Sequence, residues 1–521
     1  MKKILYILII TGCAALLSVS CSKDMLDTAP AGSLSGAEIF GDAGKAQSAV
    51  DGIYRLMYTN GWSVNWSPEH PGLAGFTLVR SLMGEDHFQY SQGNGWFYFD
   101  YSFGVASDWT HTSGRQYGTW NMFYTFISQA NYILDNEEAV KDDAEWQNVL
   151  GQAYAIRAYS YYCLYESFCQ GNYTENKDKP GVPVYTKGTN KETEGVGRGT
   201  IEGLFTQING DFQRAVDYLA SAGMPQAHSS HIDLYTAYGL WARASLGQQN
   251  YPQAATCAEN ALKKDGLKRV ATLSELGQFN NRSVGDVLWA FEYIASQAAL
   301  FGSFVSHMAI DGTYGSSAPQ CFDDWLYEEG MTDADERRAW ATLPAESPLV
   351  ADDSDFKDAE IHWQTKFGYQ NASTGVADII NLRAEEMLLT LAECKCRAED
   401  YDGARSLLQE LYDKRYSEPR DISGLANSAS VSLDTHAQPQ TLLDEILLQR
   451  RIELWCEGMG RTPDLRRLNL AYTRTETQPS AVSKKANDPS FILAIPQKEF
   501  DTRSEERRVG KECRSRWSPY H

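Results

Sequence analysis

Apolar residues recur at helical spacing along much of the chain, most clearly between residues 381 and 416. Steps of three and four put one set on a single helix face, and the same spacing resumes after a Glu399-Asp400 turn. The two sets are Ala384, Met387, Leu388, Leu391, Cys394 and Ala398, and then Tyr401, Ala404, Leu407, Leu408 and Leu411. The pattern predicts two antiparallel helices that form one hairpin.

The same pattern occurs 150 positions earlier in the chain. There, Ala242 and Ala244 precede the turn, and Asn250-Tyr251-Pro252 begins the second helix. Small side chains let two helices approach closely, and proline is tolerated in a first helical turn. This combination is typical of tetratricopeptide repeats. Since one hairpin cannot bury its apolar face alone, we predict several copies stacked into an α-solenoid.

The rest of the chain divides into further helices and two long inserts. Two stretches, 58–118 and 284–374, lose the helical period and are rich in Gly, Ser and aromatic residues, although 286–293 alternates as a strand does. Amphipathic spacing predicts helices at 37–57, 120–134, 151–168, 200–219, 232–246 and 442–456. The predicted fold class is therefore mainly α: a tetratricopeptide-like α-solenoid of helical hairpins with long irregular, aromatic-rich inserts.

Composition narrows the classes of partner. A net charge of -21 and a pI near 4.9 argue against a nucleic-acid partner, which would require a basic face. Aromatic residues make up 12% of the chain, which is a high fraction. We expect these side chains either to pack in the core or to contact a ligand. Cys394-x-Cys396 has no second Cys or His cluster nearby, so we predict no metal site there, and no cofactor is expected.

Both ends of the chain differ from the rest. Residues 1–20 are predicted to be a signal peptide, because Lys2-Lys3 precede an apolar run that is too short to span a membrane. Residues 17–21 resemble a bacterial lipobox, which makes Cys21 the predicted lipidation site and 22–36 a tether; the alternative is an ordinary secretory signal. Residues 504–521 are basic and are predicted to be a non-native tail, which leaves 37–503 as a single domain.

A series of short motifs from Cys21 to about Phe500 carries a family resemblance. They are Trp120-x-x-x-Tyr124-x-x-Ile127-x-x-Ala130-Asn131-x-x-Leu134, Gly151-Gln152-Ala153 with Arg157-Ala158-Tyr159, Gly181-Val182-Pro183-Val184, Leu382-Arg383-x-Glu385 with Ala392-Glu393, Arg450-Arg451-x-Glu453-Leu454 with Glu457-Gly458, Asp464-Leu465-x-Arg467, and Ile492-Leu493-Ala494-Ile495-Pro496. In order and spacing the chain resembles the SusD/RagB family of outer-membrane nutrient-binding lipoproteins. It departs from the family pattern at three places. Gln449 stands where the family usually has Glu, and Ala494 stands where it usually has Pro. The 458–464 loop is one residue longer and lacks an aromatic residue.

The resemblance implies a surface-exposed outer-membrane lipoprotein, anchored through Cys21, that binds a glycan or other nutrient oligomer without catalysis. It also implies a partner, a SusC-like TonB-dependent transporter over which the protein would close as a lid. Two alternatives come from the residues themselves. One is a peptide- or protein-binding scaffold, a common use of tetratricopeptide grooves. The other is an exported glycoside hydrolase, although no carboxylate pair stands out in the sequence.

Aromatic residues in the inserts are the candidate ligand platforms. Sugar rings present apolar C–H faces and hydroxyl groups, so a glycan site requires exposed aromatic rings flanked by polar side chains. Trp96 and Tyr98 follow the polar turn Gly93-Asn94-Gly95, and a second cluster is Tyr314, Phe322 and Trp325. The alternative for each is a place in the core, which we expect for Trp120 and Trp289, because they lie in regular helical or strand-like spacing.

Charged clusters predict structure rather than chemistry. Glu85-Asp86-His87 is interpreted as a solvated loop, because consecutive residues on an irregular chain rarely converge on one atom. Asp352-Asp353-x-Asp355 lacks the later Gly and Glu of a calcium loop. We predict no catalytic or metal site. A structural ion network at the end of the solenoid is expected from Arg450, Arg451, Glu453, Glu457, Arg461 and Asp464.

Overall fold

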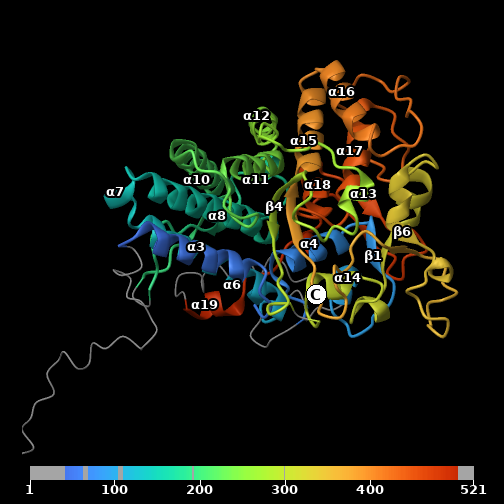
Figure 1. Ribbon diagram of the computed structural model, residues 1–521, viewed down its shortest axis with the longest axis horizontal. Helices are drawn as coiled ribbons and strands as arrows, with labels where there is room; N and C mark the ends of the chain where they lie inside the picture. Colours follow the sequence, from blue (N-terminus) through green and yellow to red (C-terminus); the bar gives the residue numbers. More distant parts are fainter. Residues whose placement is uncertain (1–40, 63–67, 104–109, 191–192, 299, 503–521) are drawn as a thin grey trace, which may run out of the picture.

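Stacked helices form the scaffold of the computed structural model, which describes residues 41–62, 68–103, 110–190, 193–298 and 300–502 (Figure 1). Neighbours in the stack pack against one another, α6 with α8, α8 with α10, α10 with α11, α11 with α12, α12 with α15, and α15 with both α16 and α17. The stacked helices are α6 (Gly114–Leu134), α8 (Ala144–Phe168), α10 (Ile201–Ala222), α11 (Leu234–Gly247), α12 (Tyr251–Ala261), α15 (Ala384–Arg397), α16 (Tyr401–Tyr412) and α17 (Leu442–Glu453). The predicted tetratricopeptide-like solenoid is confirmed.

The two predicted hairpins share one turn geometry. Gln249 and Glu399 both adopt positive φ angles, 61° and 62°, immediately before their second helices. Asn250 and Asp400 then cap these helices, and each side chain accepts a hydrogen bond from the backbone N–H three residues later. Because α12 packs against α15, the two hairpins lie side by side although the whole second insert separates them in the sequence.

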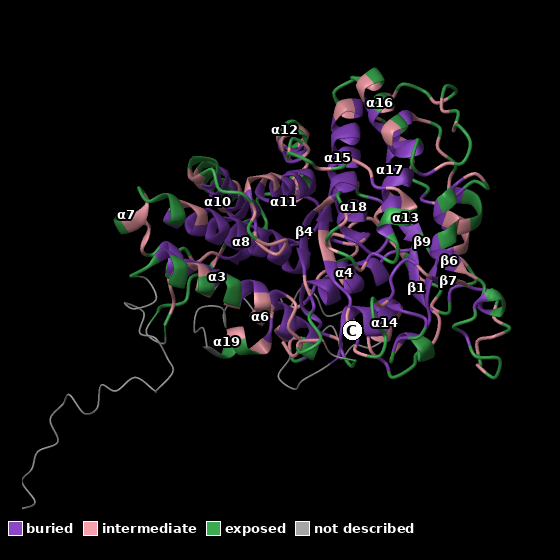
Figure 2. Ribbon diagram, viewed as in Figure 1, coloured by how far each residue is buried: buried purple, intermediate pink, exposed green. Residues whose placement is uncertain are grey.

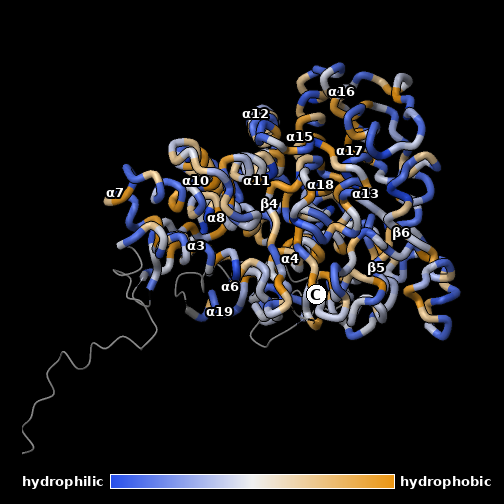
Figure 3. The backbone as a smooth tube through the Cα atoms, viewed as in Figure 1, coloured by the Kyte–Doolittle hydropathy of each residue, from blue (hydrophilic) through white to orange (hydrophobic). Residues whose placement is uncertain are grey.

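Helix α4 (Gly72–Leu82) lies inside the stretch that we predicted to be irregular. Ten of its eleven residues are buried, and these include Arg80 and Ser81 on the face that also carries Thr77, so even its polar face is covered (Figure 2). Gly72 begins the helix at a φ of 64°, in the left-handed region that favours glycine. The hydropathy colouring places apolar α4 and β4 in the middle of the molecule (Figure 3). The 58–118 insert therefore supplies a core helix as well as loops.

A small antiparallel sheet joins the two inserts. Its strand order is β1-β5-β7-β6, from β1 (His87–Gln89), β5 (Gln320–Phe322), β7 (His362–Gln364) and β6 (Ala341–Thr342). The register pairs Phe88 with Cys321. The strand predicted at 286–293 is confirmed as β4 (Val287–Phe291), which pairs with β8 (Ile379–Arg383) immediately before α15.

The remaining elements are short or peripheral. They are α3 (Ala43–Met57), α5 (Tyr98–Ser102), α7 (Glu137–Val140), α9 (Tyr173–Asn176), α13 (Leu273–Leu276), α14 (Phe304–Met308), α18 (Thr462–Arg467), α19 (Gln497–Thr502), the π-helix η3 (Trp325–Gly330), the 3₁₀ turns η2 (Gly315–Ser317), η4 (Glu336–Trp340), η5 (Pro344–Glu346) and η6 (Pro489–Phe491), and the strand pairs β2 (Pro180–Pro183) with β3 (Arg198–Thr200) and β9 (Tyr472–Thr473) with β10 (Ser483–Lys484). Among the described residues, no helix combines the length and the apolar composition needed to cross a bilayer.

Candidate functional site

Strand β5 separates the aromatic residues of the second predicted cluster. Tyr314 precedes the strand, Phe322 is its last residue, and Trp325 begins η3 beyond its far end. Phe322 has 0% of its surface exposed and stacks on Trp455 with a ring-centroid distance of 4.0 Å. It therefore belongs to the core and offers no ring face to a ligand, which corrects our expectation for this residue. Trp120 and Trp289 are buried as expected.

Tyr314 instead joins the loop that carries Trp96. The Phe97 ring lies edge-on to His307 with centroids 4.8 Å apart, and His307 stacks on Tyr314 at 4.7 Å. Phe301 completes this group, with its ring 6.2 Å from that of Tyr314. Trp96 precedes Phe97 on the same turn, and we call Trp96, Phe301 and Tyr314, three half-buried or exposed aromatic residues of the two loops, the aromatic surface. Trp96 and Tyr314 are half-buried, whereas Phe301 is 56% exposed, the largest fraction among the exposed aromatic side chains of the described chain.

Backbone contacts hold the two loops together. Tyr90 donates its backbone N–H to the Pro319 carbonyl at 2.9 Å, and the Ser91 hydroxyl donates to the Ser317 carbonyl at 2.6 Å. A Cβ on Gly93 would come within 2.9 Å of the Ala318 methyl group, so only glycine allows this approach. The positions of Trp96 and Tyr314 are therefore coupled through β1, β5 and the turns that adjoin these strands.

The turn before Trp96 has a fixed and strained backbone. Gly93, Gly95 and Phe97 adopt φ angles of 50°, 88° and 63°, and for Phe97 this left-handed conformation is costly. The Arg115 guanidinium, 5.0 Å from the ring centroid, and the edge-on contact with His307 hold the Phe97 ring in place. Strain of this kind is concentrated at functional sites. Tyr98 is the first residue of α5. Its half-buried ring lies 6.0 Å from that of Tyr101, so the side chain packs against its own helix.

Small polar side chains occupy exposed positions on the same two loops. The side chains of Gln92 and Asn94 on the first loop are exposed, as are those of Thr313, Ser316 and Ser317 on the second. Amides and hydroxyls donate and accept hydrogen bonds, so they match the hydroxyl groups of a sugar. The sequence analysis singled out Trp96 and Tyr314 but missed Phe301, whose only signal was its position between Leu300 and Gly302 in a turn-rich segment.

Trp325 lies in a different environment. Its half-buried ring is 5.3 Å from that of His436, and the Arg451 guanidinium lies 5.4 Å from its centroid. The structure therefore does not join Trp325 to Tyr314, and the two residues flank opposite ends of β5.

The cluster Glu85-Asp86-His87 is buried rather than solvated, so our interpretation of it was wrong. Arg461 donates to Glu85 at 2.7 Å, and Arg451 donates to Asp86 at 2.5 Å. His87 is hydrogen-bonded to Ser81 and Gln320, each at 2.9 Å, and its burial lowers its pKa to about 3. The three residues thus tie the first insert to α17 and to the loop that precedes α18. No set of three or more metal-ligating side chains is grouped within the described ranges.

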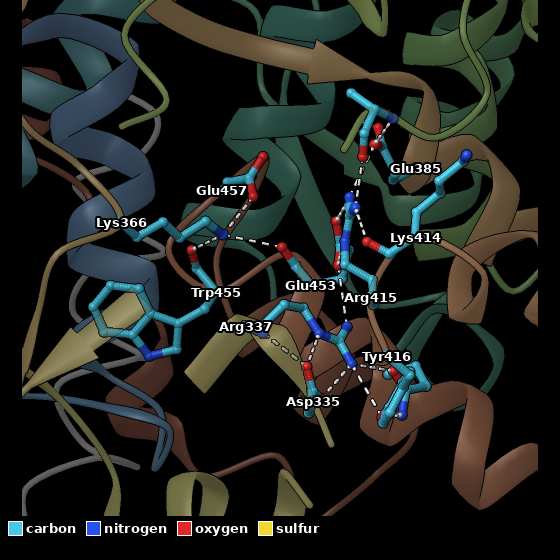
Figure 4. A network of polar contacts seen from close by, with 12 residues as sticks. Asp335, Arg337, Lys366, Glu385, Lys414, Arg415, Tyr416, Glu453, Trp455 and Glu457 are labelled. Atoms are coloured by element: carbon cyan, nitrogen blue, oxygen red, sulfur yellow. Dashed lines mark hydrogen bonds and ion pairs between the residues drawn. The ribbon is translucent and has the colours of Figure 1, made fainter. Parts of the chain in front are cut away.

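The predicted ion network is confirmed in part: Arg450 pairs with Asp464, and Arg451 and Arg461 pair with Asp86 and Glu85, whereas Glu453 and Glu457 belong to a separate network (Figure 4). Glu453 on α17 pairs with Arg337, Arg383 and Arg415 at 3.1, 2.9 and 2.8 Å. Glu457 pairs with Arg383 at 2.6 Å and with Lys366 at 2.5 Å. The network does not lie at the end of the solenoid. It lies between the helices and the second insert, which contributes Arg337 and Lys366.

The electrostatic environment in this network favours the charged form of the Glu453 carboxyl group. Burial would raise the pKa of Glu453, but the guanidinium groups of Arg415 and Arg383 hold it well below its usual range. Gln449, where the family pattern has Glu, accepts a hydrogen bond from Arg337 at 2.6 Å and donates one to Glu445 at 2.9 Å. A neutral side chain is sufficient there, because Asp335 and Glu453 already neutralise Arg337.

The other charged or thiol candidates lie where no site forms. Cys394 and Cys396 are buried free thiols. Asp352, Asp353 and Asp355 are exposed, and Asp352 pairs with Lys357 at 3.3 Å.

Two segments of the chain match known protein families. Residues 80–246 match a family described as "Starch-binding associating with outer membrane", and residues 359–517 match the SusD family. The second match extends into the segment 504–521, whose composition differs from the rest. No curated protein sequence matches the chain.

Solved structures share the fold over nearly their whole length. A SusD-like carbohydrate binding protein from Bacteroides vulgatus is 22% identical, with a TM-score of 0.74, over 89% of this chain and 97% of its own. A SusD superfamily protein from Bacteroides fragilis is 18% identical, with a TM-score of 0.69, over 90% and 99%. Surface glycan-binding protein A from Bacteroides uniformis is 16% identical, with a TM-score of 0.66, over 89% and 98%. With two family matches that together span more than half of the sequence, and with this shared fold, the chain belongs to the SusD/RagB family.

Proposed function

We propose that this protein is a cell-surface lipoprotein that binds a nutrient glycan and delivers it, without catalysis, to a SusC-like TonB-dependent transporter. The aromatic surface of Trp96, Phe301 and Tyr314, bordered by amide and hydroxyl side chains, is the observation that carries the proposal. Family membership and the carbohydrate-binding relatives support it.

Such a surface binds sugars through two kinds of contact. The C–H faces of pyranose rings pack on the exposed rings, above all on Phe301, and the ring hydroxyls exchange hydrogen bonds with Asn94, Thr313 and Ser316. Because the left-handed turn and the β1·β5 ladder fix the loops, little conformational entropy is lost on binding.

The anchor and the transporter contact complete the proposal. Cys21, the tether 22–36 and the tail 504–521 lie outside the described residues. We expect the wild-type chain to fractionate with outer membranes and the Cys21→Ala variant to be released into the soluble fraction. Recovery of a SusC-like transporter with the tagged wild-type chain from detergent extracts would support the delivery step.

Loss of the aromatic surface should abolish most of the affinity. We expect Trp96→Ala and Tyr314→Ala each to weaken glycan binding about tenfold or more, or about 1.4 kcal/mol, because each removes a stacking face. Affinity electrophoresis through native gels containing polysaccharides measures this. Trp325→Ala is the matched control, a half-buried aromatic at the other end of β5, and should bind as the wild type does. Equal losses in all three variants, or none, would contradict this location of the site.

The same experiment separates the alternatives. Incubation of the protein with each bound polysaccharide, followed by an assay for new reducing ends, tests the hydrolase hypothesis; we expect none. If no polysaccharide retards the protein, glycan binding is not its function, and the peptide-binding scaffold becomes the better hypothesis.

A further inference from the structure

We infer that the aromatic surface accepts uncharged glycans and discriminates against glycans that carry carboxylate or sulfate groups. The inference rests on the proposed function and adds to it the chemical class of the ligand. It comes from the distribution of charge around the surface, which the stacking aromatic residues do not themselves determine.

The segments that build the surface contain no cationic side chain. Residues 81–114 supply Trp96, and residues 283–336 supply Phe301 and Tyr314; neither segment contains a single Lys or Arg, although both contain Asp and Glu. Proteins recognise carboxylate and sulfate groups chiefly through Arg and Lys, with bidentate Arg contacts the most specific. A sugar acid placed on these rings would therefore find only amides and hydroxyls on the loops.

Acidic side chains lie on the segments that build the surface and on a loop that packs against the first of them. Asp311 is exposed on the loop that precedes Tyr314. The loop 351–360 lies against the first insert through Phe356, whose ring is edge-on to Tyr90 at 6.0 Å. Tyr90 precedes Ser91, the residue whose hydroxyl joins the two loops. The exposed carboxylates of this acidic loop are Asp352, Asp353, Asp355, Asp358 and Glu360.

Three cations near the surface are engaged in other contacts. Arg115, 5.0 Å from the Phe97 ring centroid, donates to both carboxyl oxygens of Asp100 at 3.0 and 2.5 Å. Lys357 donates to the Val350 carbonyl at 3.2 Å and pairs with Asp352 at 3.3 Å. Arg55 donates to Gln297 at 3.3 Å, and its guanidinium stacks over Tyr58 at 4.6 Å. None of the three offsets the acidic loop, and the whole chain has a net charge of -21, so we expect the local field to be negative.

The expected difference in affinity between neutral and anionic glycans depends on how strongly salt screens the charges. At physiological salt the Debye length is about 8 Å, and it lengthens as the salt concentration falls, so exposed carboxylates on neighbouring loops act on a bound ligand most strongly at low salt. With several such charges, we expect a carboxylated glycan to bind about tenfold or more weakly than its neutral parent, and we expect high salt to reduce this difference.

A neutral glycan and its oxidised derivative form a matched pair of ligands that tests the predicted charge discrimination. The secreted Cys21→Ala chain would be run through native gels containing neutral polysaccharides (starch, xyloglucan, galactomannan, laminarin) or anionic ones (polygalacturonate, alginate, chondroitin sulfate). A retarding neutral glycan would then be oxidised at C6 to the uronate, and its affinity measured by calorimetry at 50 and 500 mM NaCl. We expect retardation by neutral glycans, a loss of about tenfold or more on oxidation at low salt, and a smaller loss at high salt.

A charge-reversal variant provides the second measurement. Asp353→Lys with Asp355→Lys should strengthen binding of the oxidised glycan several-fold and leave binding of the neutral parent unchanged. The control is Asp142→Lys with Glu145→Lys, which makes the same change of net charge at exposed positions around the start of α8 and should alter neither affinity. A gain in the control equal to that in the test variant would show that total charge, not the acidic loop, is responsible, and would overturn the inference.

The outcomes separate this inference from the proposed function. Retardation by anionic polysaccharides only, or equal binding of the neutral and the oxidised glycan, overturns the charge discrimination and leaves glycan binding intact. Retardation by none of the seven polysaccharides overturns the proposed function, and this inference with it.

Discussion

Replacing Glu453 with Gln should lower the free energy of unfolding by about 3–5 kcal/mol, because it leaves buried guanidinium groups without their shared partner. The Glu453 side chain has 0% of its surface exposed and pairs with Arg337, Arg383 and Arg415. Urea denaturation followed by tryptophan fluorescence measures the change. Since the network joins α17 to the second insert, we also expect the insert to become more accessible to proteolysis.

A surface pair provides the comparison for Glu453. Glu138 pairs with Lys141 at 2.7 Å, and the Glu138 side chain is 86% exposed. Glu138→Gln should therefore change the free energy of unfolding by less than about 1 kcal/mol. Similar effects of the two substitutions would show that the buried network does not hold the insert on the solenoid.

Replacing Asp286 with Asn should stabilise the protein increasingly as the pH rises from about 4 to about 8. Asp286 is fully buried, and neither of its carboxyl oxygens has a hydrogen-bond partner; Oε2 of the neighbouring Glu385 lies 3.0 Å from Nη1 of Arg383. Burial and the charge of Glu385 raise the pKa of Asp286 from 3.8 to about 8. A protonated Asp286 can donate a hydrogen bond to Glu385, which gives the buried carboxyl group of Asp286 a partner.

The sign of the pH dependence follows from proton linkage. Between pH 4 and pH 8 the folded chain keeps the Asp286 proton and the unfolded chain has lost it, so this contribution to stability falls as the pH rises. The advantage of Asn over Asp should grow by at most about 1.4 kcal/mol per pH unit across this range. Urea denaturation of both proteins at several pH values measures the difference.

An exposed aspartate is the control for Asp286. On the acidic loop 351–360, Asp353→Asn should change the free energy of unfolding by less than about 0.5 kcal/mol at every pH. If the Asp286→Asn difference is constant with pH, Asp286 does not hold a proton in the folded protein.

Periodicity accounts for what the sequence predicted well. Helices such as α10 and α16 have one apolar face and one polar face, so the spacing of residues such as Leu204 and Leu407 marks them directly. The repeat at a separation of 150 residues likewise predicted the paired turns at Gln249 and Glu399. The sequence analysis did not predict helix α4, because the surrounding elements bury it on almost every side.

Contacts between distant segments account for what the sequence analysis missed. Glu85 and Asp86 looked like a solvated loop because their partners, Arg451 and Arg461, lie more than 360 residues further along the chain. No local sequence pattern predicts an ion pair between such distant residues. The free-energy cost of burying a carboxylate is offset only by the cationic side chain that the fold places next to it.

The sequence by itself determined that this chain folds into stacked helical hairpins of the SusD/RagB family and that aromatic-rich inserts interrupt them. Those features depend on local spacing and on short motifs. Only the tertiary structure decided which of the aromatic residues are exposed and which are buried. The β1·β5 ladder buries Phe322, joins Tyr314 to the Trp96 loop and leaves Trp325 at the far end, because strand pairing, not sequence spacing, sets which side chains the sheet covers.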